Sequence, residues 1–268
     1  MKKLLLGIVL AAALTPVVAQ QPAVPVNPAL TDRFWFGLGG FFPKTATEAG
    51  LSSQTTGVGA DVKFEDTLGM DSRKAVPVLM GRWRMAEHWR LEFEYFELNR
   101  SGQRVLNRDV TFGDRTFPAG SGLTSNFDFS DLRVSAGWSF FKRTDKEIGI
   151  GLGLHMASYD VSLSTAATGS EQEDVLAPLP VISMYGQFAL TNTWAVGMRA
   201  DLFALSYDNF DGRLTSVGID VTWQPFRNIG FGVAYRTLFI DMEATKNNRV
   251  LRFEQTFEGP MLFMTASF

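Results

Sequence analysis

The side chains that could do chemistry in this sequence are mostly charged residues at alternate positions between apolar ones. The set comprises Arg82, Arg84, Arg90, Glu92, Glu94, Arg133, Arg199, Asp201, Asp220 and Arg236. In extended strands a spacing of two puts side chains on one face, so we expect this set to share one side of a sheet. Arg82 and Arg84 precede a tight turn and should lie across from Glu92, which follows it. Because an unpaired buried charge is costly, we interpret the set as an ion-pair network, with a charge-lined conduit for small solutes as the alternative.

Catalysis by a nucleophile and a base is less favoured, because the sequence has two His. His88 falls in a predicted turn, which is a poor place for a pocket. His155 lies near Ser158 and Asp160 in the run HMASYD, but these two have the opposite parity unless a β-bulge near Ala157 intervenes. Such a bulge would also explain the apolar residues that follow at positions expected to face inward, Tyr159, Val161 and Leu163. The sequence therefore predicts no catalytic residues.

Acidic residues gather in two predicted connections, at 171–174 and at 208–211. Glu171, Glu173 and Asp174 are expected to be solvated, although such carboxylates could bind divalent cations among lipopolysaccharide phosphates. We predict no metal site and no cofactor. The absence of Cys excludes thiolate ligands and disulfides, and a net charge of −3 argues against a nucleic-acid partner.

The start of the chain is typical of an exported protein. Lys2 and Lys3 precede an apolar run, Leu4–Leu14, which is too short to span a membrane as a helix. We interpret residues 1–19 as a cleaved signal peptide. The Pro- and Ala-rich segment 20–32 is expected to be a short periplasmic lead-in without a core, followed by one domain over residues 33–268.

The rest of the chain alternates apolar and polar residues with a period of two, the pattern of β-strands. The clearest segments are Arg33–Lys44, Lys74–Met85, Trp89–Glu97, Leu132–Phe140, Lys146–Met156, Val181–Leu190, Trp194–Leu202, Gly212–Gln224, Ile229–Arg236 and Pro260–Phe268. Their polar faces carry Gly, Ser and Thr with scattered charges and almost no Lys. Such a face suits the crowded interior of a narrow barrel better than a solvated surface.

Turn lengths alternate as well. The tight turns are Ala86–His88, Lys142–Asp145, Thr191–Thr193 and Pro225–Asn228, and the longer connections are Thr45–Lys74, Arg100–Asn126, Ser164–Leu176, Asp208–Arg213 and Ala244–Val250. Aromatic residues lie beside the tight turns, as at one membrane interface. We predict about ten strands; eight would require merging segments, and twelve would require Thr56–Glu65 and a partner to enter the wall.

The end of the chain carries the resemblance to a known class. Leu262, Met264, Ala266 and Phe268 share one face of a strand that ends in Phe, and it resembles the carboxyl-terminal strand of bacterial outer-membrane β-barrels. Together with the export signal, the chain looks like a small barrel of the OmpA- and OmpW-like kind, in no particular subfamily. The resemblance implies a Gram-negative outer membrane, contact with its lipids and lipopolysaccharide, and a terminal strand that is read by the barrel insertion machinery and closes against the first strand.

The predicted fold is thus all-β: a transmembrane, antiparallel, up-and-down barrel with short periplasmic turns and longer external loops. The favoured function is a non-catalytic barrel with a narrow, charge-filled interior, which is structural or binds through its loops. A narrow, porin-like channel for small solutes is the alternative. A lipid-modifying enzyme is the third possibility. The oligomeric state is left open.

Overall fold

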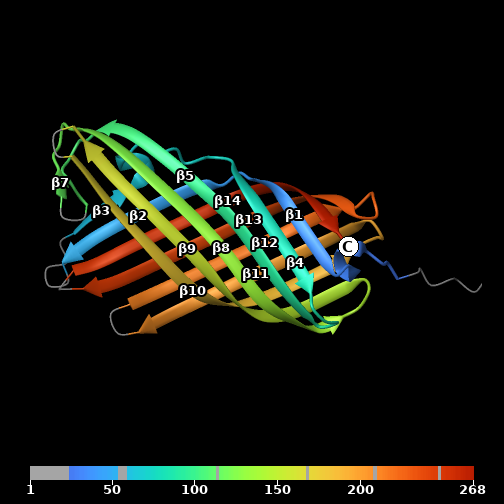
Figure 1. Cartoon of the computed structure of the whole chain (residues 1–268). Helices are drawn as coiled ribbons and strands as arrows, with labels where there is room; N and C mark the ends of the chain where they lie inside the picture. The colour runs from blue at the N-terminus through green and yellow to red at the C-terminus, as the bar shows by residue number, and fades with distance from the viewer. Residues whose placement is uncertain (1–23, 54–58, 113–114, 167–168, 208–209, 247–248) are drawn as a thin grey trace, which may run out of the picture.

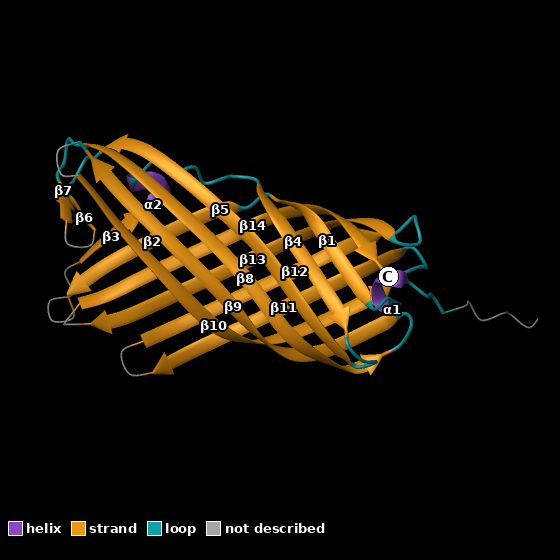
Figure 2. Cartoon of the chain, in the orientation of Figure 1, coloured by secondary structure: helices purple, strands orange, loops and turns teal. Residues whose placement is uncertain are grey.

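The computed structural model describes residues 24–53, 59–112, 115–166, 169–207, 210–246 and 249–268 (Figures 1 and 2). The predicted signal peptide, residues 1–19, lies outside the described residues. Within the described ranges, no helix is both long enough and apolar enough to cross a membrane.

One antiparallel sheet follows the chain order and closes on itself as a ten-stranded barrel, which confirms the predicted fold class and strand number. The first wall strand is made of β1 (Phe34–Phe41) and β2 (Lys44–Ser53), which both pair with the last strand. The others are β4 (Val76–Arg84), β5 (Trp89–Val105), β8 (Gly122–Lys142), β9 (Lys146–Thr165), β10 (Gly169–Ala189), β11 (Trp194–Tyr207), β12 (Phe210–Trp223), β13 (Ile229–Lys246) and β14 (Arg249–Ser267). They cross the barrel obliquely (Figure 1).

The last strand closes the barrel against the first. β14 pairs with β1 from Trp35–Ser267 to Phe41–Met261, and the backbones of Phe34 and Phe268 exchange hydrogen bonds of 2.9 and 3.0 Å. Both ends of the described chain therefore lie at the end of the barrel that carries the short turns (Figure 2). We call this the short-turn end.

The outside of the barrel near the short-turn end is an apolar belt. Leu152, Met198 and Trp223, three residues expected to face outward, have exposed fractions of 70%, 48% and 42%. On β8 the belt runs from Leu132 to Phe140, which matches the roughly 9–11 residues that a tilted strand needs to span a bilayer. Aromatic residues gather beside the short turns, and Trp194 stacks on Trp223 with ring centroids 5.9 Å apart.

Beyond the belt, the polarity of the two faces reverses. On β8 the outward positions become Ser130, Asp128 and Asn126, whereas the inward positions become the buried Phe129 and Phe127. We call the part of the barrel beyond the belt the dome. Its centre is a buried aromatic and aliphatic cluster that includes Phe41, Phe96, Phe127, Phe129, Tyr159, Leu238 and Phe257.

This reversal corrects one expectation about β9. His155, Tyr159 and Leu163 all face inward and are buried, and the pairing of β9 with both neighbours continues without a shift through Ala157. The proposed bulge near Ala157 is therefore wrong. A register shift between β8 and β9 occurs instead near the short-turn end, between Trp138 and Phe141. The apolar residues after His155 face inward because they belong to the dome.

Much of what was expected to be external loop is strand. β9 and β10 continue through most of the segment 164–176, and β5 and β8 extend into the segment 100–126, which also contains a hairpin of β6 (Val110–Phe112) and β7 (Arg115–Phe117). β3 (Gly59–Lys63) pairs with the part of β2 that lies in the dome, so it extends the sheet there and does not cross the belt. Polar residues facing water and apolar residues facing the dome interior keep the period of two, so the ladder does not stop at the belt.

Part of the long connection between β2 and β4 covers one side of the dome. The pairing of β4 with β5 ends at Val78 and Phe96, and the helix α2 (Phe64–Thr67) and its flanking residues cover the edge that remains. Arg100 of β5 donates to the Glu65 carboxylate at 2.5 Å and to the Thr47 hydroxyl at 2.6 Å. This connection therefore holds β2 and β5 together.

Candidate functional site

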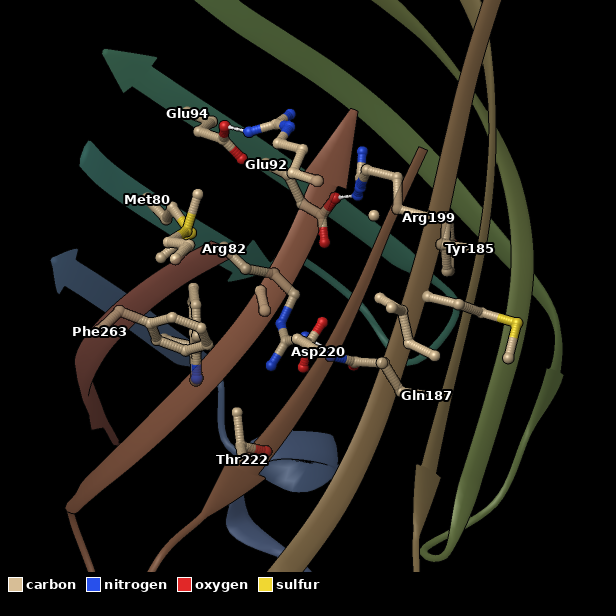
Figure 3. A pocket seen from close by; sticks show the side chains of 18 of the residues that line it. Met80, Arg82, Glu92, Glu94, Tyr185, Gln187, Arg199, Asp220, Thr222 and Phe263 are labelled. Atoms are coloured by element: carbon tan, nitrogen blue, oxygen red, sulfur yellow. Dashed lines mark hydrogen bonds and ion pairs between the residues drawn. The ribbon is translucent and has the colours of Figure 1, made fainter. Parts of the chain in front are cut away.

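The ten predicted charged residues all lie on the inner face of the belt region. Seven are buried: Arg82, Arg84, Arg90, Glu94, Arg133, Asp201 and Arg236. Glu92, Arg199 and Asp220 are partly buried. Figure 3 shows several of them converging from opposite walls.

Ion pairs cross the bore between strands that are not neighbours. Glu92 of β5 contacts Arg199 of β11, and Glu94 of β5 contacts Arg236 of β13 (Figure 3). Arg133 of β8 lies 3.8 Å from Glu94 and 3.9 Å from Glu92. These pairs join opposite sides of the barrel, so the charges fill its cross-section as a layer.

The side of this layer nearest the short-turn end includes a residue that the sequence analysis missed. Glu147 of β9 is fully buried, and its carboxylate accepts from Arg84 at 2.9 Å, from Lys142 at 3.2 Å and from the Ser139 hydroxyl at 2.5 Å. Arg90 lies 3.5 Å away. The sequence did indicate that Glu147 faces inward, because it alternates along β9 with the glycines that were assigned to the interior.

Tyr185 of β10 was also missed. Its ring lies 3.2 Å beneath the Arg90 guanidinium, and its hydroxyl lies 3.0 Å from the Ser139 hydroxyl. Gly137 and Gly149 face the ring from β8 and β9, where a Cβ atom would overlap it. These glycines therefore make room for an aromatic side chain that caps a buried cation.

The two His residues occupy different environments. His88 is exposed at a short turn, with Nδ1 2.7 Å from the Ser139 carbonyl. His155 is fully buried between the ionic layer and the dome, with Nδ1 2.9 Å from an Asp131 oxygen and Nε2 3.9 Å from Asp201. Ser158 and Asp160 lie on the outward face of β9, so the run HMASYD does not bring its His, Ser and Asp together.

Residues 26–32, in the segment expected to be a lead-in, pack against the short-turn end. They contain the short helix α1 (Pro28–Thr31), in which Leu30 is fully buried. Asn27 caps α1 by accepting from the Ala29 amide at 3.0 Å, and Lys142 donates to the Leu30 carbonyl at 2.9 Å. The Asn-Pro pair at the helix start is the local signal, but a four-residue helix leaves no periodicity to detect.

Between α1 and the ion pairs lies a cavity of about 140 Å³, which we call the chamber. It is large enough for several water molecules. Its lining includes Arg82, Gln187, Ser216 and Asp220, with Ala29 of α1 among the lining residues (Figure 3). Arg82 lies opposite Glu92 in the register of β4 and β5, as expected, but its guanidinium donates to the Gln187 side chain at 2.6 Å and to the Ala29 carbonyl.

The acidic residues of the segment 171–174 lie on β10 rather than in a loop. Asp174 lies opposite Asp160, which in turn lies opposite Asp128 on β8. Position 208 falls outside the described residues. Among the side chains that the structure describes, no three His, Cys, Asp or Glu come together in a way that could hold a metal ion.

Comparisons with known proteins give no match in sequence and several in structure. No protein-family model matches the chain, and a search of curated proteins finds no match. The outer membrane protease OmpT from Escherichia coli superposes with a TM-score of 0.57 at 10% identity, over 87% of this chain and 97% of that chain. The translocator domain of autotransporter NalP from Neisseria meningitidis gives 0.44 at 11% identity, over 88% and 87%. OprG from Pseudomonas aeruginosa gives 0.38 at 11% identity, over 88% and 97%.

At such low identity these similarities concern the fold, and they assign no catalytic, binding or transport residue. The similarity to OmpT spans nearly the whole of both chains. It agrees with the closure of the last strand on the first. The chain therefore has the fold of a closed, ten-stranded antiparallel β-barrel, as the outer membrane protease does.

Proposed function

We propose that the protein is a closed, non-catalytic outer-membrane barrel that acts through its dome, as a rigid platform held beyond the membrane. The observation that carries this proposal is the filling of the bore by two successive layers of different chemistry. Because the short-turn end is the expected periplasmic end, the dome would project from the cell surface.

The ionic layer is the first support for closure. Glu92 and Glu94 of β5 contact arginines on β11 and β13, so the pairs extend across the bore. Arginines that are held by partners on several strands cannot move aside without leaving a buried charge unpaired. A solute crossing this layer would have to break such pairs.

The aromatic centre of the dome is the second support. The ring of Phe129 packs against Phe257 at 4.8 Å, against Tyr159 at 5.0 Å and against Phe96 at 5.8 Å between centroids. These rings come from β5, β8, β9 and β14 and are almost completely buried. A packed apolar layer of this kind excludes ions and water, and it makes the dome rigid enough to present a fixed surface.

Single-channel recording in planar bilayers tests closure. We expect the purified protein to give no stable open current, because both layers block the bore. Insertion of the silent protein should be verified by recovering folded barrel from the bilayer lipids, and a general porin in the same bilayer should give its usual steps. A stable current from the wild-type chain would contradict the proposal.

A narrow channel for small polar solutes is the second candidate, and the chamber is the observation that favours it. This candidate requires the ion pairs to part transiently, so it is the function that a stable current would support. An enzymatic role is the third. Its test replaces His155 with Ala and compares the acyl patterns of lipopolysaccharide, which we expect to be unchanged because His155 is sealed between two layers.

A further inference from the structure

The segment that closes the short-turn end is held by few interactions. The Leu30 side chain is buried, Val26 donates its amide to the Asn192 side chain at 3.0 Å, and the side chain of Asn27 reaches the Thr191 carbonyl at 3.3 Å. A helix of four residues has no stability of its own. Its position therefore depends on these contacts and on the two cations, Arg82 and Lys142, that bind its carbonyl groups.

Arg82 differs from the other arginines of the ionic layer. Arg84, Arg90, Arg133, Arg199 and Arg236 each have a carboxylate within 4.0 Å. For Arg82, the described residues offer no carboxylate at that distance, although the residue is buried, with an exposed fraction of 6%. Its partners are two neutral acceptors, the Gln187 side chain and the Ala29 carbonyl, and its Nε atom has no hydrogen-bond partner.

Asp220 is an acidic residue in the same cavity that also has no ion-pair partner among the described residues. It lines the chamber from β12, together with Arg82 from β4, and within the described part of the chain no ion pair joins it to a basic side chain at 4.0 Å or less. Arg82 and Asp220 thus face the same small cavity as opposite charges without a direct contact (Figure 3). Opposite charges attract each other more strongly in a poorly solvated interior than in bulk water.

We propose that α1 is a latch whose release lets Arg82 pair with Asp220 and opens the chamber to the periplasm. With α1 docked, the Ala29 carbonyl holds Arg82 away from Asp220. With α1 undocked, Arg82 loses that acceptor and pairs with Asp220 across the chamber. The pair stabilises the open state and thereby offsets part of the contacts that α1 gives up. The dome stays closed in both states, so the chamber exchanges its contents with the periplasm alone.

The absence of Cys from the sequence permits a direct test. Ser216, buried on β12 and lining the chamber, is replaced by Cys in the purified full-length protein. The rate of labelling by 2-sulfonatoethyl methanethiosulfonate then reports how often the chamber is open. Ser101→Cys, at an exposed position on the dome, serves as the control thiol and should label at one rate in every background.

Three substitutions distinguish the latch from a passive plug. Leu30→Ser removes the apolar anchor, and we expect labelling of the chamber thiol to accelerate by about tenfold or more. Asn192→Ala removes one hydrogen bond of the docked state and should accelerate it by about fivefold. Asp220→Asn removes the partner that Arg82 has only in the open state, so it should slow labelling by about threefold to tenfold.

The opposite signs of these effects are the decisive result. If α1 were a passive plug and Asp220 a structural residue, Asp220→Asn would leave labelling unchanged or accelerate it, and either outcome overturns the proposal. Equal labelling rates with and without Leu30→Ser would overturn it as well. Heat-dependent migration in gels verifies that each variant is folded, and Asn192→Ala, on the exposed turn between β10 and β11, keeps the test usable if Leu30→Ser does not fold.

Discussion

Replacing Glu147 with Gln is the most informative single perturbation of the ionic layer. The Glu147 carboxylate is fully buried and lies within 3.5 Å of Arg84, Arg90 and Lys142. Gln keeps the shape and can still accept from Ser139, but it removes the negative charge that these three basic side chains share. Breaking a buried ion pair in this way costs about 3–5 kcal/mol. Because Lys142 is partly exposed and can turn towards water, we expect a loss of about 3 kcal/mol.

The matched control is Glu254→Gln on the outer face of β14. Glu254 is 41% exposed and pairs with Arg252 at 3.5 Å, and surface pairs contribute at most about 1 kcal/mol. The assay is urea unfolding of each variant in short-chain phosphatidylcholine liposomes, followed by Trp emission. A second substitution, Arg84→Met, in the Glu147→Gln background should recover part of the loss, because it removes a charge left without a partner. If the two Gln variants had equal stability, the ion-pair layer would not hold the barrel together.

Three further predictions concern other parts of the barrel. Phe129→Ala should lower the free energy of unfolding by about 3–5 kcal/mol, whereas Val134→Ala on the lipid face of the same strand should cost about 1 kcal/mol or less; equal losses in urea titrations would argue against an apolar dome. Gly149→Ala places a Cβ against the ring of Tyr185 and should cost about 1–3 kcal/mol, and a neutral result would show that the ring does not occupy that space. Phe268→Ala should reduce the fraction of chain recovered as folded, heat-modifiable barrel from outer membranes, and an unchanged fraction would mean that the terminal Phe does not aid insertion.

The strands of the barrel wall could be predicted from the sequence, because successive side chains face lipid and the barrel interior in turn, and these two environments favour different residues. Trp223 and Asp220 lie three residues apart on one strand. Trp223 faces outward and Asp220 faces the interior, as expected for an odd and an even position of the same strand. The closing strand could be assigned for the same reason, since Leu262 and Met264 alternate with inward residues up to the final Phe268. In these regions, local pattern and overall fold agree.

The alternation of polar and apolar residues was misleading where a strand leaves the apolar belt and enters the dome. Beyond Leu132 the outward face meets water and the interior is apolar, so the pattern keeps its period while the two faces exchange character. Read locally, Tyr159 and the apolar residues after it resemble a bulge, and the polar residues of the segment 164–176 resemble a loop. The change between Ser130 and Leu132 becomes clear only when the burial of both faces of β8 is known.

Specific partners in the interior were also beyond the sequence. Arg82 was expected to face Glu92 and does so in backbone register, but its side chain reaches Gln187 and Ala29 from segments far away in the chain. Cross-bore contacts depend on the tilt and closure of all ten strands. The role of Ala29 depends on a four-residue helix that has no pattern of its own.

A nitroxide scan of residues 123–140 would measure the reversal of polarity along β8 position by position. Each position is replaced singly by Cys, labelled, and measured for collisions with oxygen, which concentrates in lipid, and with a water-soluble nickel chelate. We expect labels at even positions from 132 to 140 to collide mainly with oxygen, and labels at even positions from 124 to 130 to collide mainly with the nickel chelate. Labels at odd positions should collide little with either. Nickel access at Phe127 and Phe129, or a change of parity between 130 and 132, would contradict this expectation.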